Sequence, residues 1–291
     1  MSVILNQKYI IGEEFYNSNI PTALRNALKD SKNGGFVASM PQLIHGKVIA
    51  PKDNDIWKKW YTAFSEEDLV ITPQGGKYIV DIHGGGILMP DRINQALEEE
   101  NGLINGAARF SDDENKSLVN LINNGELSDG TEIPVYTVKD IREGISDLPK
   151  RFVYVVDFNN VGKSDYLNKK EFMKSDLVIA RIGSVSEVES YFDKAIRFDK
   201  KVGNWHRFKN IGSDVPQGRL LYLNYGNYGP LGYNDLYYDG RFVGVAPEVQ
   251  VASENLVITP ELERILEVVN PFVAEVNGKE LREALKLVYK R

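Results

Sequence analysis

The chain has 291 residues, 42% of them hydrophobic and 26% charged, a balance typical of a soluble globular protein rather than a disordered one. Its net charge of −6 argues against general binding to nucleic acids or to acidic membranes, which requires a basic face. Because the chain has no cysteine, disulfides, cysteine-ligated zinc and thiol catalysis are excluded.

The beginning of the chain shows no basic stretch followed by a long apolar run, so we expect no signal peptide. No window approaches the roughly 18 consecutive apolar residues that a membrane-spanning helix needs. We therefore expect a cytoplasmic protein without a membrane segment.

The first part of the chain predicts a helix, an extended segment, a second helix and a hairpin. The helix begins at Ile20, with a proline in its first turn, and two glycines end it at residues 34–35. Residues 36–50 are expected to be extended, and 55–68 to form a helix with an aromatic stripe that packs in the core. The runs 69–72 and 78–82 are strand-like and flank a four-residue turn with two glycines.

The rest of the chain alternates between predicted helices and strands. Ser111 and Glu114 have the spacing of a capping box, and Gly125 is placed to end that helix. Short helices are expected over 138–144 and after Ser184 or Ser186. Strands are expected over 133–136, 152–158, 177–182, 219–223 and 242–245.

Alternation of this kind predicts an α/β or α+β fold, and the hairpin indicates a mixed sheet with flanking helices. We expect one core domain over residues 1–259. Residues 260–291 are expected to form a C-terminal helical tail, that is, a segment packed on the core.

The strongest candidate site is the glycine-rich end of the strand at 78–82, where His83 is followed by Gly84, Gly85 and Gly86. Glycine lets a ligand approach the backbone, and N–H groups before a helix, here the one starting at Pro90, attract anions. The His-Gly-Gly-Gly run also occurs in the oxyanion loop of some α/β-hydrolase esterases, but the required G-x-S-x-G nucleophile motif is missing here. The alternative is a structural turn with a hydrogen-bonded histidine.

Residues 157–164 end in Gly-Lys-Ser after a predicted strand, which resembles part of a phosphate-binding loop. That loop requires glycine where the chain has Asp157, so we do not predict a nucleotide triphosphatase. Asp157 itself is a candidate acid, base or metal ligand at a strand end, and the alternative is that it caps the following turn.

The chain has three histidines, His45, His83 and His206, each beside glycine or in a turn-like context. With Asp81 or Asp157 they are candidates for a zinc or iron site, but no local histidine pair supports one. We therefore assign no metal ligand, and the sequence names no cofactor.

Two further segments carry candidate ligand-binding residues. Arg181, Gly183 and Ser184 follow the expected strand–glycine–helix order and suit an anion, with a helix cap and a surface salt bridge as the alternative. Residues 222–242 contain six tyrosines separated by glycine and asparagine, including Tyr225 and Tyr228. This segment is either a ligand-facing surface or lid, or a hairpin whose tyrosines cover the core rim.

These patterns lead to the hypothesis of a hydrolase or group transferase acting on a small anionic or nucleotide-like ligand. His83, Asp157 and His206 would be catalytic, and His83, Asp157 and Arg181 would converge on one cleft. The other ligand-binding candidates are Gly84, Gly85, Gly86, Gly183, Ser184, Tyr225 and Tyr228. The alternatives are a non-catalytic interaction protein that uses the Tyr-rich segment 222–242, and a structural component that associates with itself.

Overall fold

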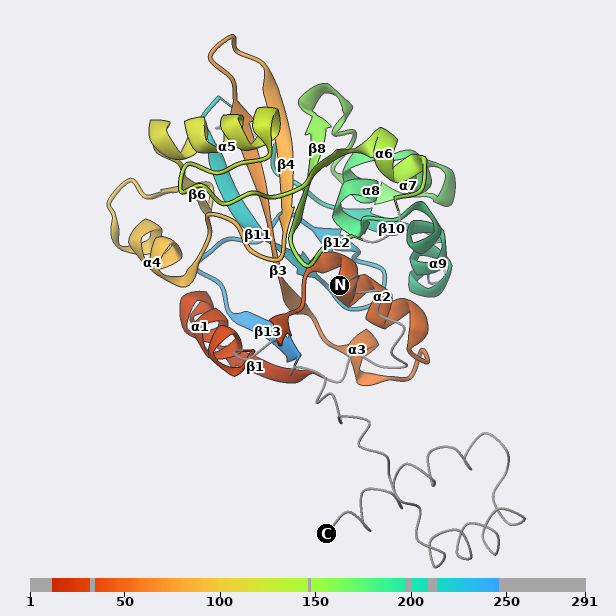
Figure 1. Cartoon of the computed structure of the whole chain (residues 1–291). Coiled ribbons are helices and arrows are strands. Elements are labelled where there is room, and N and C mark those ends of the chain that lie inside the picture. The colour runs from red at the N-terminus through yellow and green to blue at the C-terminus, as the bar shows by residue number, and fades with distance from the viewer. Residues whose placement is uncertain (1–11, 32–34, 146–147, 197–199, 209–213, 246–291) are drawn as a thin grey trace, which may run out of the picture. The chain divides into compact units, whose positions relative to one another are not determined.

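The computed structural model describes residues 12–31, 35–145, 148–196, 200–208 and 214–245 (Figure 1). They belong to a first compact unit, Met1–Pro247, and the second unit, Glu248–Arg291, lies outside the described residues. The predicted helical tail over 260–291 and its boundary at 259 therefore stay predictions. Among the described residues, no helix is long and apolar enough to cross a membrane.

A mixed sheet of eight strands forms the centre of the described part (Figure 1). Its order is β5-β6-β11-β3-β4-β8-β7, with β12 paired to β11; all pairs are antiparallel except β7 with β8. The strands are β3 (Tyr61–Ile71), β4 (Lys77–His83), β5 (Leu103–Ile104), β6 (Ala107–Arg109), β7 (Val135–Thr137), β8 (Phe152–Asp157), β11 (Gln217–Leu223) and β12 (Pro230–Leu231). The predicted mixed α+β architecture is confirmed.

Two smaller sheets flank the large one. In the first, β13 (Gly240–Val245) lies between β1 (Glu13–Asn17) and β2 (Phe36–Val37). In the second, β9 (Asp165–Leu167) pairs antiparallel with β10 (Val202–Asn204). Strand β1 thus pairs with β13, more than 220 residues further along the chain.

Helices cover both faces of the large sheet and bury two hydrophobic clusters against it (Figure 1). One cluster includes residues of α2 (Met40–Ile49), α3 (Asp55–Lys58), α6 (Val138–Arg142), α7 (Lys169–Lys174), α8 (Asp176–Ile182) and α9 (Val185–Ala195). The other includes residues of α1 (Ile20–Asp30), α4 (Pro90–Glu98) and α5 (Asp112–Asn124). Strand β3 serves both: Ala63 and Leu69 belong to the first cluster, Phe64 and Val70 to the second.

Several local predictions are confirmed because short-range signals decided them. Helix α1 begins at Ile20 after Asn19, whose side chain accepts the Thr22 N–H. Strands β3 and β4 form the expected hairpin around residues 73–76. Helix α5 has the expected capping box and ends at Gly125, which has φ 73°.

Three predicted elements are wrong. Residues 40–49 form helix α2 instead of extended chain, because Ser39 and Gln42 cap its start and Pro41 occupies its first turn. Of the helix predicted over 55–68, only Asp55–Lys58 is helical, and the rest belongs to the central strand β3, which is buried on both faces and so lacks alternation. The strand predicted over 177–182 is part of helix α8, and because residues 177–182 are all buried, their sequence shows no helical alternation of apolar and polar residues.

The capping box of α5 predicts a measurable stability effect. Ser111 accepts the Glu114 N–H, and Ser111→Ala would leave that donor without its cap, so we expect a loss of about 1 kcal/mol in the free energy of unfolding. Urea denaturation of the variant measures the loss. Lys116→Ala on the exposed side of the same helix is the control, and an equal loss in both variants would contradict the capping explanation.

Candidate binding surface

His83 ends β4 inside the core and is fully buried. Its Nε2 lies 3.1 Å from the Ala180 carbonyl oxygen, which can only accept, so Nε2 carries the proton and Nδ1 accepts from the Ser65 hydroxyl at 2.8 Å. Burial lowers the pKa of His83 to about 4, so the ring is neutral at pH 7. These contacts make His83 a structural link between β3, β4 and α8. They agree with the alternative prediction, a structural turn with a hydrogen-bonded histidine.

The glycine-rich loop after His83 does hold an anion, but the anion is the protein's own Glu66. The Ile87 and Leu88 N–H groups donate to the two Glu66 oxygens at 2.6 and 2.7 Å. Gly84 and Gly85 have φ of 87° and 97°, which favour glycine, and a Cβ at Gly86 would lie 2.1 Å from Glu66 Oε1. The loop therefore does let an anion approach its backbone closely, as predicted, but the Glu66 side chain occupies that position.

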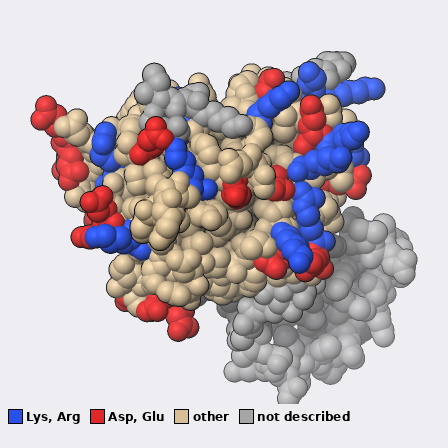
Figure 2. All heavy atoms as spheres, turned by 90° about the horizontal axis from the view of Figure 1, so that it is seen from above, with Lys and Arg blue, Asp and Glu red and all other residues tan. Residues whose placement is uncertain are grey.

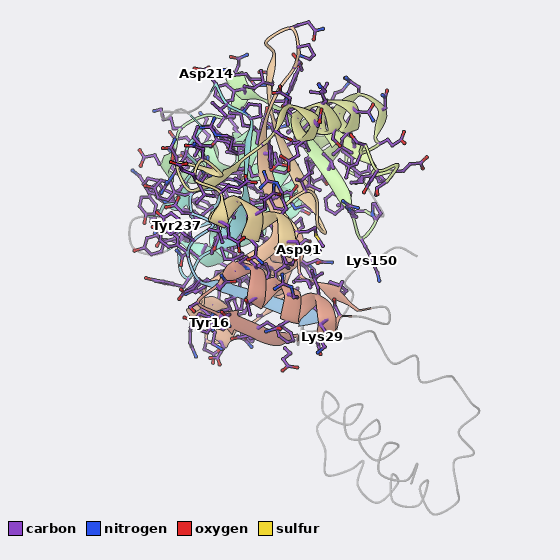
Figure 3. All side chains as sticks on the ribbon, turned by 90° about the vertical axis from the view of Figure 1, so that its left-hand side faces the viewer. Tyr16, Lys29, Asp91, Lys150, Asp214 and Tyr237 are labelled. Carbon is purple, nitrogen blue, oxygen red and sulfur yellow. The ribbon has the colours of Figure 1, made fainter. Side chains whose placement is uncertain are left out.

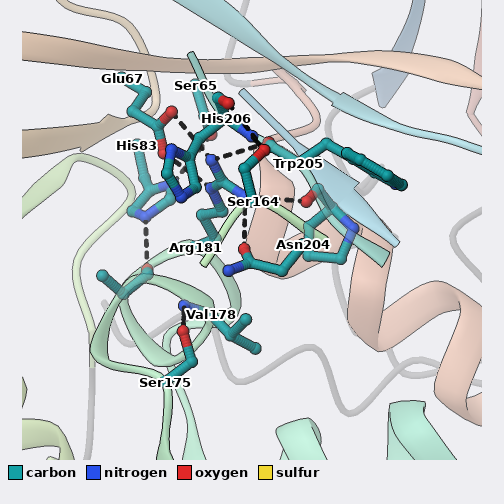
Figure 4. A network of polar contacts seen from close by, with 12 residues as sticks. Ser65, Glu67, His83, Ser164, Ser175, Val178, Arg181, Asn204, Trp205 and His206 are labelled. Atoms are coloured by element: carbon teal, nitrogen blue, oxygen red, sulfur yellow. Dashed lines mark hydrogen bonds and ion pairs between the residues drawn. The ribbon is translucent and has the colours of Figure 1, made fainter. Parts of the chain in front are cut away.

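Arg181 also meets an internal carboxylate instead of a ligand. It belongs to α8, is fully buried, and forms a two-pronged ion pair with Glu67 of β3 (Nε to Oε2 2.7 Å, Nη2 to Oε1 2.9 Å) (Figure 4). Its remaining N–H groups donate to Asn204 Oδ1 and to the Pro230 and Trp205 carbonyls. The alternative of a surface salt bridge at Arg181 is thus also wrong, because the pair is in the core.

Two further buried carboxyls accompany these anions. Asp81 is the cross-strand neighbour of Glu67, and Asp68 lies two residues from Glu66 on β3. Burial, followed by the charge of the adjacent Glu67, raises the pKa of Asp81 well above its usual value. Burial, followed by the charge of Glu66, also raises the pKa of Asp68 well above its usual value. Burial and the neighbouring carboxyl groups therefore favour the protonated form of both Asp81 and Asp68.

The other predicted catalytic residues do not complete an active site. Asp157 is exposed and lies opposite Tyr78, whereas His83 lies opposite Phe152, so the two occupy different ends of the β4–β8 pair. The Asp157 carboxylate accepts the Asn159 N–H, which is the turn-capping alternative. His206 is buried. Its backbone forms an isolated β-bridge with Gly232, and its ring stacks on the ring of Phe208.

The structure brings His83, Arg181 and His206 into one buried region, as Figure 4 shows, but Asp157 lies outside it. Gly183 has φ 79° and ends α8, and Ser184 caps α9 through the Glu187 N–H. His45 pairs with Glu187 on another part of the surface. Among the described residues, no group of three His, Asp or Glu side chains could hold a metal ion.

Three buried basic side chains hold the inner side of the Tyr-rich segment. The Lys47 amino group donates to the Asn224 carbonyl at 2.7 Å, Arg181 to Pro230 at 3.0 Å, and Arg219 to Tyr233 at 3.3 Å. Backbone bonds add to this hold, including Gly232 N–H to the Trp205 carbonyl. The backbone of residues 224–234 is therefore fixed mainly from within the molecule.

The outer side of the segment is aromatic and exposed. Five of its tyrosines, Tyr225, Tyr228, Tyr233, Tyr237 and Tyr238, are 38–57% exposed, whereas Tyr222 is 2% exposed. Figure 3 shows Tyr237 and Tyr16 along the same edge of the molecule, and the Tyr16 hydroxyl donates to Asp239 next to Tyr238. A hairpin with tyrosines covering the core rim is thus correct only for Tyr222.

Ring contacts extend this surface to residues that the sequence did not single out. Tyr228 contacts Tyr166 of β9 at 6.3 Å between ring centroids, and Tyr166 contacts Trp205 at 5.3 Å. Trp205 in turn contacts Tyr233 at 6.5 Å. No sequence signal joins Tyr166 and Trp205 to the segment, because the β9–β10 pairing brings them together. We call the five exposed tyrosines with Tyr166 and Trp205 the aromatic surface.

The cavities of the described part lie outside the Tyr-rich segment. Three cavities of about 470, 500 and 480 Å³ in the described part are lined by residues outside 222–242. On the face that Figure 2 shows, positive and negative side chains are interspersed, and neither sign covers the face alone. The aromatic surface therefore does not form the wall of these cavities.

Comparison with known proteins agrees with this picture. No protein-family model and no curated protein matches the chain. Among solved structures, the chain is similar to a protein described as "Accommodation of massive sequence variation in Nanoarchaeota by the C-type lectin fold". The two share 27% sequence identity with a TM-score of 0.61, over 80% of this chain and 97% of that chain.

This likeness corrects the functional prediction. The similarity to a protein with the C-type lectin fold contradicts the predicted hydrolase, transferase and nucleotide-binding activities, which are therefore wrong. The structural reason is that the predicted anion positions are filled by Glu66 and Glu67. The alternative of a non-catalytic interaction protein fits better.

The proton on Asp81 predicts a dependence of stability on pH. The pKa of Asp81 is higher in the folded chain than in the unfolded chain, so its contribution is complete at acid pH and is lost as pH rises through the folded-state pKa. Asp81→Asn replaces the carboxyl group by an amide of nearly the same shape that cannot ionise. We expect the variant to gain stability relative to wild type as pH increases, as measured by urea denaturation at several pH values. A constant difference across pH would contradict a protonated Asp81.

The Arg181–Glu67 pair predicts strong energetic coupling. Arg181→Met leaves Glu67 as a buried carboxylate without its partner, so we expect a loss of ~3–5 kcal/mol in the free energy of unfolding. Adding Glu67→Gln to this variant should recover part of that loss. A double-mutant cycle by urea denaturation measures the coupling, and additive effects of the two changes would contradict it.

Proposed function

We propose that the chain is a non-catalytic binding protein that contacts a protein partner through the aromatic surface. The observation that carries this proposal is the division of the Tyr-rich segment into two sides. Its carbonyls are held from within by Lys47, Arg181 and Arg219, while five tyrosines face outward. We also propose that the protein acts in the cytoplasm.

The chemistry of the segment supports a protein partner. Tyrosine combined with glycine and asparagine is the composition of antibody paratopes, in which tyrosine supplies rigid amphipathic contact area and the small polar residues adapt. Aromatic residues are also enriched at the cores of protein interfaces. A fixed backbone lowers the entropy that binding loses.

The ring geometry favours an irregular protein surface over stacked bases or sugars. Neighbouring rings meet at steep angles: 69° for Tyr225–Tyr228, 86° for Tyr166–Trp205 and 66° for Trp205–Tyr233. Stacking of successive bases uses ring faces along one track, which these orientations do not supply. The net charge of −6 also disfavours a polyanionic partner.

The structural neighbour, described as accommodating massive sequence variation, supports a second part of the proposal. We infer that the exposed tyrosine positions of this chain tolerate substitution, since the contacts that hold the segment are made by buried side chains and by backbone groups. The surface would then change partners without a change of fold.

The test is a comparison of two purified full-length chains on arrays of proteins, glycans and single-stranded DNA. One chain is wild type; the other has serine at Tyr225, Tyr228, Tyr233, Tyr237 and Tyr238. We expect wild type to bind one or more arrayed proteins, and the serine variant to lose at least about 30-fold in affinity, the effect of removing a hot spot of about 2 kcal/mol. Equal melting temperatures would show that the variant is folded.

A matched control carries serine at Lys29, Lys116 and Lys139, which lie on exposed helical surfaces away from the segment. This control should bind as wild type does. Protein binding that survives in the five-serine variant, or binding to glycans or DNA instead of proteins, would contradict the proposal.

A further inference from the structure

Lys47 differs from the other two cations that hold the Tyr-rich segment. It belongs to α2, is fully buried, and its Nζ lies 2.7 Å from the Asn224 carbonyl and 5.3 Å from the ring centroid of Trp57. The Asn224 N–H donates to the Gly229 carbonyl, which closes a turn containing Tyr225 and Tyr228. Lys47 therefore contacts this turn at the point where it closes.

The charged groups packed around Lys47 give it no carboxylate partner in the described part of the chain. Lys52 lies over the same Trp57 ring, at 5.0 Å from its centroid. Lys194 of α9 donates to the Val48 and Ala50 carbonyls, and Glu187 of α9 pairs with His45. Burial without a compensating anion lowers the pKa of Lys47 to about 7.

The two arginines stay charged at neutral pH. Arg181 has the Glu67 carboxylate as its partner. Burial lowers the pKa of Arg219 only to about 10, and Arg219 holds the part of the segment at Tyr233 and Asn234. Lys47 is therefore the contact of the Tyr225–Tyr228 turn that changes its protonation in the neutral range, whereas Arg219 at the Tyr233 region does not. The Gly203 N–H and the Lys201 carbonyl, which bond to Asn227, hold the same turn without titrating.

We propose that Lys47 is a positioning residue for the turn at residues 224–229, and that proton uptake by Lys47 releases this turn and its two exposed tyrosines. The proposal rests on the proposed function, because it concerns regulation of the same aromatic surface. As a neutral amine, Lys47 donates one hydrogen bond to Asn224 without an unpaired buried charge. As an ammonium, it gains more from hydration than from one carbonyl, so it favours the open turn.

The direction of the pH dependence follows from the difference in the pKa of Lys47 between the closed and the open turn. In the open turn the hydrated amine would have a pKa near the free value of about 10.4, whereas it is about 7 in the closed turn. The closed turn therefore loses stability as pH falls from the higher value through the lower one. The Tyr225–Tyr228 half of the surface is ordered on the alkaline side and loosened on the acid side.

The experiment is NMR of the full chain without any partner, from about pH 5 to about pH 9. The amides of Gly226 and Gly229 report on the turn, and the amide of Gly232 reports on the part held by Arg181. The ¹³Cε signals of lysine report the titration of Lys47 directly. We expect Gly226 and Gly229 to shift with a midpoint that matches the Lys47 signal and lies above the closed-turn value of about 7 but below about 9, and Gly232 to shift little.

Three variants separate Lys47 from other causes. Lys47→Met, which is apolar and cannot titrate, should abolish the shift of Gly226 and Gly229. Lys47→Arg, which stays charged, should hold the turn in its acid form at every pH. His45→Gln removes the histidine of α2, which contacts Glu187, and it should leave the shift unchanged.

A Lys47 signal that titrates above about pH 9, near the free value, would overturn the proposal, as would a turn shift that persists in Lys47→Met. If Lys47→Met does not fold, the direct ¹³Cε titration of wild type and the His45→Gln spectra decide alone. Because no partner is present, a negative result here leaves the binding proposal standing, and a failed array leaves this titration measurable.

Discussion

The ion pair between Arg181 and Glu67 links the central sheet to the Tyr-rich segment that carries the aromatic surface. It connects helix α8 to the central strand β3 in the core. A pair of this kind is stable only when its remaining hydrogen-bonding groups are satisfied, and Arg181 achieves this by donating to Asn204 and to the Trp205 and Pro230 carbonyls. The same guanidinium therefore fixes the sheet, the β10 region and the Tyr-rich segment in relation to one another. Gly232 packs directly against this pair, and a Cβ there would lie 1.7 Å from Glu67 Oε1.

The chain uses anion-binding geometry for its own architecture. Glu66 accepts two backbone N–H groups from the glycine-rich loop, and Glu67 accepts the guanidinium of Arg181. Both features resemble ligand sites when read along the sequence, because the chemistry that binds a foreign carboxylate also binds an internal one. The consequence is a polar network inside the protein, next to a segment whose five outer tyrosines are exposed. A binding surface on such a support can vary in its side chains while its backbone stays in place.

Sequence alone predicted the features that neighbouring residues determine. The cap at Ser111, the β3–β4 hairpin, the glycine-rich approach and the tyrosines at 225 and 228 all follow from local patterns. The Ser-Glu-Glu-Asp run at 65–68 was placed in a helix because the aromatic residues before it have helical spacing, whereas it lies in the central strand β3. Their partners, Arg181 and the loop at 87–88, are remote in sequence, so only the fold shows that these charges are satisfied in the core. For the same reason, Tyr166 and Trp205 were not associated with the segment.

The most direct test of whether buried contacts hold the Tyr-rich segment is amide hydrogen exchange over residues 224–235, measured by mass spectrometry in wild type and two variants. One variant carries serine at the five exposed tyrosines, and the other carries Arg181→Met. If buried contacts hold the backbone, the first variant exchanges as slowly as wild type and the second exchanges faster at Leu231 to Asn234. Fast exchange in the five-serine variant would contradict the account, because the exposed tyrosines themselves would then be what orders the segment.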